Sequence, residues 1–339
     1  MTSTPPATTA GTVDGAVSGS GSPTGARVAR VVQRQGALVI LVAVMLIASL
    51  AFDTFGSRGN LTGIAMQSSF LAVVSLGMTF VIMTGGIDLS VGSVFALGGV
   101  LAAWGSQYGA LAALLLPLVI CGLIGLVQGL LVARAGLPAF IVTLAGLLFA
   151  RGLLLLISNE GSTTYKVPQG SGFLELARGE LLGIKYPVWI VLVLFLIAGL
   201  VLHRTSYGST VLAIGGQEDA ADLMGLPVQR TKVVTYVLSA VLAGFGGAMI
   251  ASYTASGVTI LGVGMELDAI AAVVLGGTLL TGGAGTILGT LVGVLLLQVI
   301  KNVINQVGSL DSDWQAVVSG TILLVVVTVQ RYLTRVERS

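Results

Sequence analysis

Long apolar stretches alternate with short polar segments along most of the chain. A stretch of about 20 apolar residues is long enough to cross a bilayer as a helix. The pattern predicts ten spans, of which the third, sixth, eighth and ninth are short: 36–52, 61–83, 90–104, 110–132, 139–158, 187–202, 233–253, 267–280, 285–301 and 314–330. We therefore expect an all-α polytopic membrane protein with about ten transmembrane helices.

The segments that flank the spans are short or simple in composition. Residues 1–26 are rich in Thr, Ser, Gly, Ala and Pro, so we expect a disordered N-terminal tail. A transmembrane domain is expected over 27–335, with 336–339 as a C-terminal tail. Residues 27–51, which are first basic and then apolar, would also fit a cleaved signal peptide. Because nine further spans follow, we favour a transmembrane helix for this segment.

The composition supports membrane insertion and excludes several function classes. The chain is 55% hydrophobic and 9% charged, whereas soluble domains carry about 25% charged residues. A net charge of +2 does not indicate a nucleic-acid partner, and a single cysteine, Cys121, excludes an intrachain disulfide. No nucleophile, general base or set of metal ligands stands out, and the only histidine, His203, is expected at a membrane edge. We therefore predict no catalytic site and no metal site.

The distribution of Lys and Arg predicts the orientation, because cytoplasmic loops are enriched in both. With the N-terminus inside, ten of the sixteen basic residues are cytoplasmic, and an even number of spans places both termini in the cytoplasm. The loop 159–186 is then external and the loop 203–232 cytoplasmic. Arg151 falls at membrane depth, where it could either extend towards the headgroups or pair with a carboxylate such as Glu160.

An acidic residue interrupts the apolar pattern between the second and third spans, in MTGGIDLSVGS (83–93). Gly85 and Gly86 are expected to end the second span. Asp88 or Ser90 could then cap the third helix at the membrane edge. Alternatively Asp88 borders a substrate path, because acidic residues at membrane depth are often functional. We expect Asp88 to serve both purposes.

A second acidic segment, GVGMELDAIAAVVLGG (262–277), precedes the eighth span. Glu266 and Asp268 stand at the start of the span, again between glycines, and Gly276 and Gly277 lie within the predicted range 267–280. Five spans separate this segment from Asp88, which predicts opposite membrane faces and an inverted repeat of spans 2–5 and 7–10. Glycine-interrupted segments at matching positions of two halves indicate the translocation pathway of a transporter.

Small residues also recur every four positions in two spans, which favours close helix packing. The first ridge consists of Ser239, Ala243, Gly247 and Ala251. The second consists of Gly285, Gly289 and Gly293.

The cytoplasmic loop 203–232 is long for a connector. It contains Gly215 and Gly216, then a short helical piece from Glu218 to Met224 that Gly225 should end. Such a helix could dock into another protein or form part of a plain surface loop. The chain has no Walker phosphate loop, so any ATP that drives transport is bound by a separate subunit.

Four long strings resemble the ribose/xylose/galactose-type sugar permeases of ABC importers, within the branched-chain amino-acid/monosaccharide permease superfamily. These strings cover 77–100, 138–152, 213–225 and 262–290. Within that family the chain looks most like a galactofuranose importer permease. The resemblance implies a non-enzymatic subunit that moves a monosaccharide, of the galactofuranose or ribose type, across the bacterial cytoplasmic membrane. It also implies the fold of a ten-helix type II importer.

The resemblance further implies an ATPase-coupling motif and a set of partners. The coupling residues would be Gly215, Gly216, Glu218, Asp219, Ala220, Ala221 and Gly225. The partners would be a second permease, identical or homologous, ABC ATPase subunits and an extracytoplasmic sugar-binding protein, with no cofactor on this chain. Two alternatives are a branched-chain amino-acid permease and an ion-coupled secondary transporter, in which Asp88, Glu266 and Asp268 would bind ions.

Overall fold

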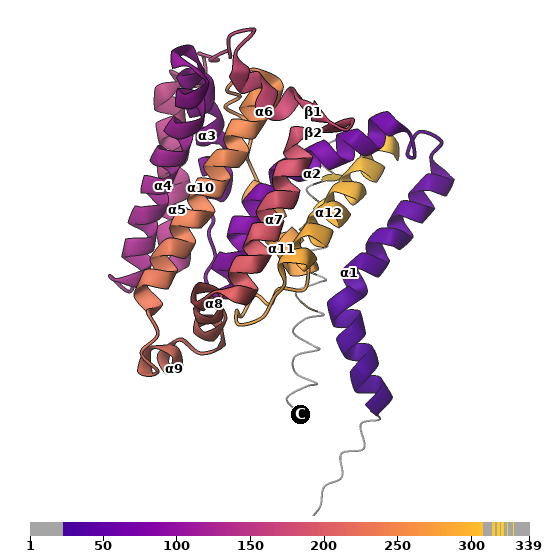
Figure 1. The fold of residues 1–339 in the computed structure, drawn as a ribbon, viewed down its shortest axis with the longest axis vertical. Coiled ribbons are helices and arrows are strands. Elements are labelled where there is room, and N and C mark those ends of the chain that lie inside the picture. The colour runs from indigo at the N-terminus through magenta and orange to yellow at the C-terminus, as the bar shows by residue number, and fades with distance from the viewer. Residues whose placement is uncertain are drawn as a thin grey trace, which may run out of the picture.

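The computed structural model describes residues 23–307, with side chains from Gly36 onward, and separate positions between 314 and 328. Helices dominate this part of the chain (Figure 1). They are α1 (Pro23–Ala51), α2 (Arg58–Met83), α3 (Val91–Gly105), α4 (Ala110–Ala133), α5 (Ala139–Ile157), α6 (Glu175–Arg178), α7 (Tyr186–Arg204), α8 (Ser206–Gly216), α9 (Glu218–Leu223), α10 (Val228–Thr254), α11 (Met265–Leu275) and α12 (Ile287–Val307). Two short 3-10 helices, η1 (Ser106–Tyr108) and η2 (Gly172–Leu174), and a hairpin of β1 (Glu180–Leu181) and β2 (Ile184–Lys185) complete the described elements.

A helix coincides with each of the first nine predicted spans, while the tenth, 314–330, lies outside the described residues except for separate positions. Six of the described helices are long and apolar enough to cross a membrane: α2, α4, α5, α7, α10 and α12. The predicted eighth span is wrong in length. Its helix, α11, has 11 residues and ends at Leu275, because Gly276 and then Gly277, with φ +88°, turn the chain away. Like the 15-residue α3, α11 is too short for a full crossing of about 20 residues.

The central helix α10 packs against α2, α3 and α4 (Figure 1). Glycines allow this close approach, because they remove the side chains that would separate the backbones. A Cβ atom added at Gly98 of α3 would lie 2.5 Å from the carbonyl oxygen of Gly244 on α10, and one added at Gly77 of α2 would lie 2.7 Å from the Cα of Ser239. The predicted ridge that begins at Ser239 is buried in this core, which confirms its packing role.

The C-terminal side of the fold pairs α11 with α12, and α12 in turn with α1. A Cβ added at Gly289 would lie 2.0 Å from the carbonyl oxygen of Gly276, and one added at Gly293 would lie 2.0 Å from that of Ala272. The second predicted ridge therefore packs α12 directly on α11.

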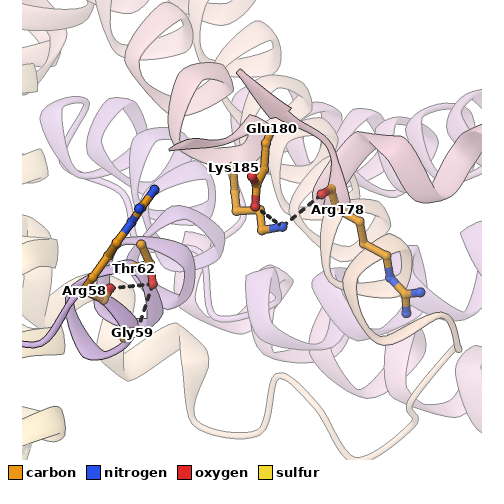
Figure 2. Close-up of polar contacts among 6 residues, drawn as sticks. All are labelled: Arg58, Gly59, Thr62, Arg178, Glu180 and Lys185. Carbon is orange, nitrogen blue, oxygen red and sulfur yellow. Dashed lines mark hydrogen bonds and ion pairs between the residues drawn. The ribbon is translucent and has the colours of Figure 1, made fainter. Parts of the chain in front are cut away.

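The loop 159–186 folds over the end of α10 and carries η2, α6 and the hairpin. The Ser252 hydroxyl of α10 donates to the Phe173 carbonyl at 2.8 Å and accepts from the Ala177 N–H at 3.1 Å. Figure 2 shows Lys185 of β2 between the Glu180 carboxylate at 2.6 Å and the Arg178 carbonyl at 3.1 Å. The hydrogen bond from Lys185 and its positive charge lower the pKa of Glu180 below the usual value. This contact closes the hairpin immediately before α7 begins.

Candidate functional site

The Asp88 loop, residues 84–90, connects the end of α2 to the start of α3 inside the helix bundle. Gly85 adopts a φ of +79°, which lets the chain leave α2 in a sharp turn. Gly86 must lack a side chain, because a Cβ there would lie 2.5 Å from the Tyr236 hydroxyl oxygen. The loop consequently carries Asp88 into the protein interior, where its side chain has no exposed surface.

Three donors hold the Asp88 carboxylate. One oxygen accepts from the Ser90 N–H at 2.9 Å and from the Ser90 hydroxyl at 2.6 Å, while the other accepts from the Ser239 hydroxyl at 2.9 Å. The first bond closes a turn just before α3, so Asp88 does satisfy a backbone N–H at the helix start. The Ser90 side chain, in contrast, makes no capping bond to the helix.

The depth of Asp88 differs from the predicted membrane edge. Its partner Ser239 lies eleven residues into α10, which runs from Val228 to Thr254. A rise of 1.5 Å per residue places Ser239 about 16 Å along that helix, close to its midpoint. Asp88 is therefore buried level with the middle of α10, because the loop between α2 and α3 and its glycines enter the bundle.

Two polar side chains beside the loop were not expected from the sequence. Gln128 of α4 lies 3.4 Å from the Ser90 hydroxyl, measured to its amide oxygen, and Tyr236 of α10 reaches Gly86. Within the described part of the chain, the Gln128 amide nitrogen and the Tyr236 hydroxyl are buried and have no hydrogen-bond partner. The carboxylate thus lies beside two polar groups with unused hydrogen-bonding capacity. Gln128 offered a sequence signal, as a polar residue in an apolar span, whereas Tyr236 offered none.

The second acidic segment lies next to the Asp88 loop and not on the opposite face. A Cβ added at Gly92, in the first turn of α3, would lie 2.4 Å from a carboxylate oxygen of Glu266 and 2.3 Å from the Gly262 carbonyl oxygen. Four residues of chain span at most about 14 Å, so Asp88 and Glu266 belong to one region. The prediction of opposite faces is wrong because α3 and α11 are half-length helices whose first turns meet.

The remaining charges of this region are paired or bonded. Asp268 of α11 forms an ion pair with Lys301 of α12. Arg151 of α5 donates to the carbonyl oxygens of Thr259 at 2.8 Å and Leu261 at 3.5 Å. Arg151 therefore neither extends to headgroups nor pairs with Glu160, as the sequence suggested, but ties α5 to the segment before α11.

The other end of α11 leads to a contact that we call the glycine junction, formed by Gly85, Gly215, Gly282 and Gly283. The Gly283 N–H donates to the Met83 carbonyl at 3.0 Å. A Cβ at Gly215, near the end of α8, would lie 1.9 Å from that carbonyl oxygen and 2.2 Å from the Gly283 nitrogen. A Cβ at Gly282 would lie 2.8 Å from the Gly85 nitrogen. The junction thus brings α8 into backbone contact with the end of α2, where the Asp88 loop begins.

The segment that follows the junction matches the predicted short helix. α9 runs from Glu218 to Leu223, and Gly225 ends it with a φ of +75°. Ala221 is buried against Ile214 and Val228, while Glu218 pairs with Lys232 at 2.5 Å. The structure adds α8, which the sequence suggested only as loop.

The outer surface of α9 is free of contacts with the rest of the described chain. Two neighbouring large apolar side chains at its end are exposed, Leu223 at 89% and Met224 at 69%. Asp219 and Gly216 are also exposed, whereas Ala220 is half-buried. α9 lies at the edge of the helix bundle (Figure 1), and both acidic and apolar side chains of this segment are exposed.

Comparisons of the sequence with known proteins match a family of membrane permeases. The sequence model of the family described as "Branched-chain amino acid transport system / permease component" matches residues 60–327. The inner membrane ABC transporter permease protein YjfF of Escherichia coli (strain K12) is 39% identical over 89% of this chain and 94% of its own length. The ribose import permease protein RbsC of the same strain is 40% identical over 87% and 92%, and the L-arabinose ABC transporter permease protein AraH of Azospirillum brasilense is 34% identical over 91% of both chains. No solved structure matches the chain significantly.

Proposed function

The chain belongs to the branched-chain amino acid transport system / permease component family, and from this premise we propose that it is the membrane-spanning subunit of an ATP-driven monosaccharide importer. A permease of this family is a transport component and not an enzyme. The relatives named for ribose and L-arabinose support a sugar as the substrate. Among sugars, galactofuranose and ribose are the candidates that the sequence strings favour.

The observation that carries this proposal is the backbone contact between α8 and the end of α2 at the glycine junction. An ATPase that grips α9 would move α8, because Ala221 of α9 packs on Ile214 of α8. A backbone carbonyl and N–H cannot turn away as a side chain can, so a shift of Gly215 acts directly on Met83 and Gly283. The Asp88 loop begins at this point, and its movement would alternately open the path to each side of the membrane.

The polar groups around Asp88 suit the passage of a sugar. Tyr236 and Gln128 can bond to hydroxyl groups, and such weak contacts let a substrate leave again. Together with Gly85, Gly86, Ser90, Glu266, Asp268, Gly276 and Gly277 they would border the pathway. Sugar would then move near the meeting point of the half-helices α3 and α11, the arrangement that is typical of transporter binding regions.

The full assembly would contain a second permease, a pair of ATPase subunits below α9 and a sugar-binding protein at the opposite face. In this arrangement both termini and the loop 203–232 are cytoplasmic, and the loop 159–186 faces outward. Ten spans with inverted repeats of spans 2–5 and 7–10 remain our prediction for the complete domain. ATP is bound by the separate subunits.

The family description leaves a branched-chain amino acid as the competing substrate class. The test is uptake by the complete importer in proteoliposomes with ATP. Labelled ribose should enter, and an excess of unlabelled monosaccharides, galactofuranose included, should reduce its uptake, while leucine should not. Competition by leucine but not by sugars would overturn the assignment to monosaccharides.

A further inference from the structure

An apolar groove of about 1020 Å³ runs between α1, α7 and α12, and Gly276, at the end of α11, also lines it. In Figure 1 α12 stands between α7 and α1, and it contacts both. Leucines and other apolar side chains line most of the groove, among them Leu38 of α1, Leu196 and Leu200 of α7, and Leu291 and Leu295 of α12. The volume of the groove is close to the upper limit of about 1,000 Å³ that is typical of small-molecule sites. Its apolar lining suits a hydrocarbon ligand.

One end of the groove carries the positive charge of Arg204. His203 and Arg204, the last two residues of α7, lie there beside Thr286 at the start of α12. Neither basic side chain has a hydrogen bond or ion pair within the described part of the chain, and no acidic side chain from that part lines the groove. An arginine remains charged at any physiological pH. This end therefore favours an anionic group.

The length of the groove matches one leaflet of a bilayer. From Leu192 to Arg204, both of which line it, α7 rises about 18 Å. Half of the hydrocarbon core measures about 15 Å. An apolar ligand that extends along the groove from Arg204 would consequently end near the middle of the membrane.

We propose that this groove is a binding site for one anionic phospholipid, with the phosphate at His203 and Arg204 and an acyl chain along α7 and α12. The charge of the end, the apolar lining and the leaflet length all match this occupant. A bound lipid would fill the space between α1 and α7, and so hold the first helix against the bundle.

The chain offers a matched pair of glycines for the test. A Cβ added at Gly199, inside the groove, meets nothing within 4 Å, so the side chain of Gly199→Phe starts in open space and occupies part of the groove. Gly152 of α5 is equally open and lies outside the groove, so Gly152→Phe controls for an added aromatic side chain in the membrane. Arg204→Gln removes the charge at the end of α7, and Arg134→Gln removes an exposed arginine at the end of α4 as its control.

The measurement is native mass spectrometry of the full-length chain, extracted with the subunits that co-purify and reloaded with phosphatidylglycerol or phosphatidylethanolamine. The wild-type chain should retain one phospholipid and prefer phosphatidylglycerol. Arg204→Gln should reduce that preference about fivefold, the factor for one basic residue at an anionic surface, while Gly199→Phe should lose both lipids. Both controls should bind as the wild type does.

Three results would overturn the site. Gly199→Phe could retain lipid as well as Gly152→Phe does. The wild-type chain could bind both lipids equally and keep that behaviour in Arg204→Gln. Finally, Gly199→Phe could prevent a co-purifying subunit from binding while the wild-type chain carries no lipid, which would identify a protein as the occupant. Arg204→Gln should melt at the same temperature as the wild-type chain, so that a change in its lipid preference cannot be attributed to misfolding.

Discussion

Gly215→Ala should impair transport, whereas the neighbouring Gly216→Ala should not. The new methyl group at Gly215 would lie 1.9 Å from the Met83 carbonyl oxygen and 2.2 Å from the Gly283 nitrogen, and both are backbone atoms. At Gly216 an added Cβ meets nothing within 4 Å. The two glycines are equivalent in the sequence motif, so they form a matched pair that only the structure distinguishes.

The size of the effect follows from these contacts. Overpacking typically costs about 1–3 kcal/mol, and loss of the hydrogen bond from Gly283 to Met83 adds about 1 kcal/mol. Any state that keeps the junction would lose about 2–4 kcal/mol of stability relative to states in which the junction is open. Because 1.4 kcal/mol is a factor of ten, the relative population of the state with the junction would fall more than about tenfold.

The assay is sugar uptake and ATP hydrolysis by the complete importer in proteoliposomes, with thermal melting as a check on assembly. Gly215→Ala should reduce uptake per ATP hydrolysed about tenfold or more, while Gly216→Ala remains close to wild type. Equal activity of both variants would show that the junction does not transmit movement. A general loss of assembled protein in Gly215→Ala would be visible in the melting and is distinguishable from uncoupling.

Three further predictions concern other parts of the molecule. Asp88→Leu should destabilise the protein by about 3 kcal/mol in thermal or denaturant unfolding, at about 1 kcal/mol for each of three stranded donors, whereas Asp88→Asn should keep part of the uptake; equal, full uptake by both would remove Asp88 from the mechanism. Deletion of 218–224 or Gly225→Arg should abolish uptake and stimulation of the ATPase while membrane insertion persists, and normal uptake would disprove the docking role. Lys185→Gln should raise the pKa of Glu180 towards its usual value in an NMR titration. Because that pKa is lowered in the folded state, the small stabilisation by the pair should be present above the unfolded pKa and lost as the pH falls through the folded value; an unchanged titration would contradict the contact.

Much of the helical architecture could be predicted from apolar run lengths alone. The nine runs before residue 307 each coincide with a helix, because bilayer-length apolar segments have few alternatives to a helix. The run at 267–280 was too long because its apolar composition continues past Gly276, while the backbone turns there to pack on Gly289. Composition does not encode such a contact.

The site was only partly accessible to sequence reasoning. Asp88 stands out because only 9% of the residues are charged, and Gly85 and Gly86 stand out because they form a glycine pair at the end of an apolar run. Their depth was missed, since it depends on the bond between Asp88 and Ser239, which lie 151 residues apart. The position of Glu266 beside Gly92 was missed for the same reason, because the first turns of the two half-helices meet and no local sequence pattern records that contact.

The most direct test of the proposed function is the energy source of transport. Proteoliposomes that hold this chain with its co-purified ATPase and partner subunits should accumulate sugar only when ATP is available to the ATPase, and an uncoupler should have no effect at constant ATP. Sugar accumulation by vesicles that hold this chain alone, driven by a proton or sodium gradient, would contradict the account.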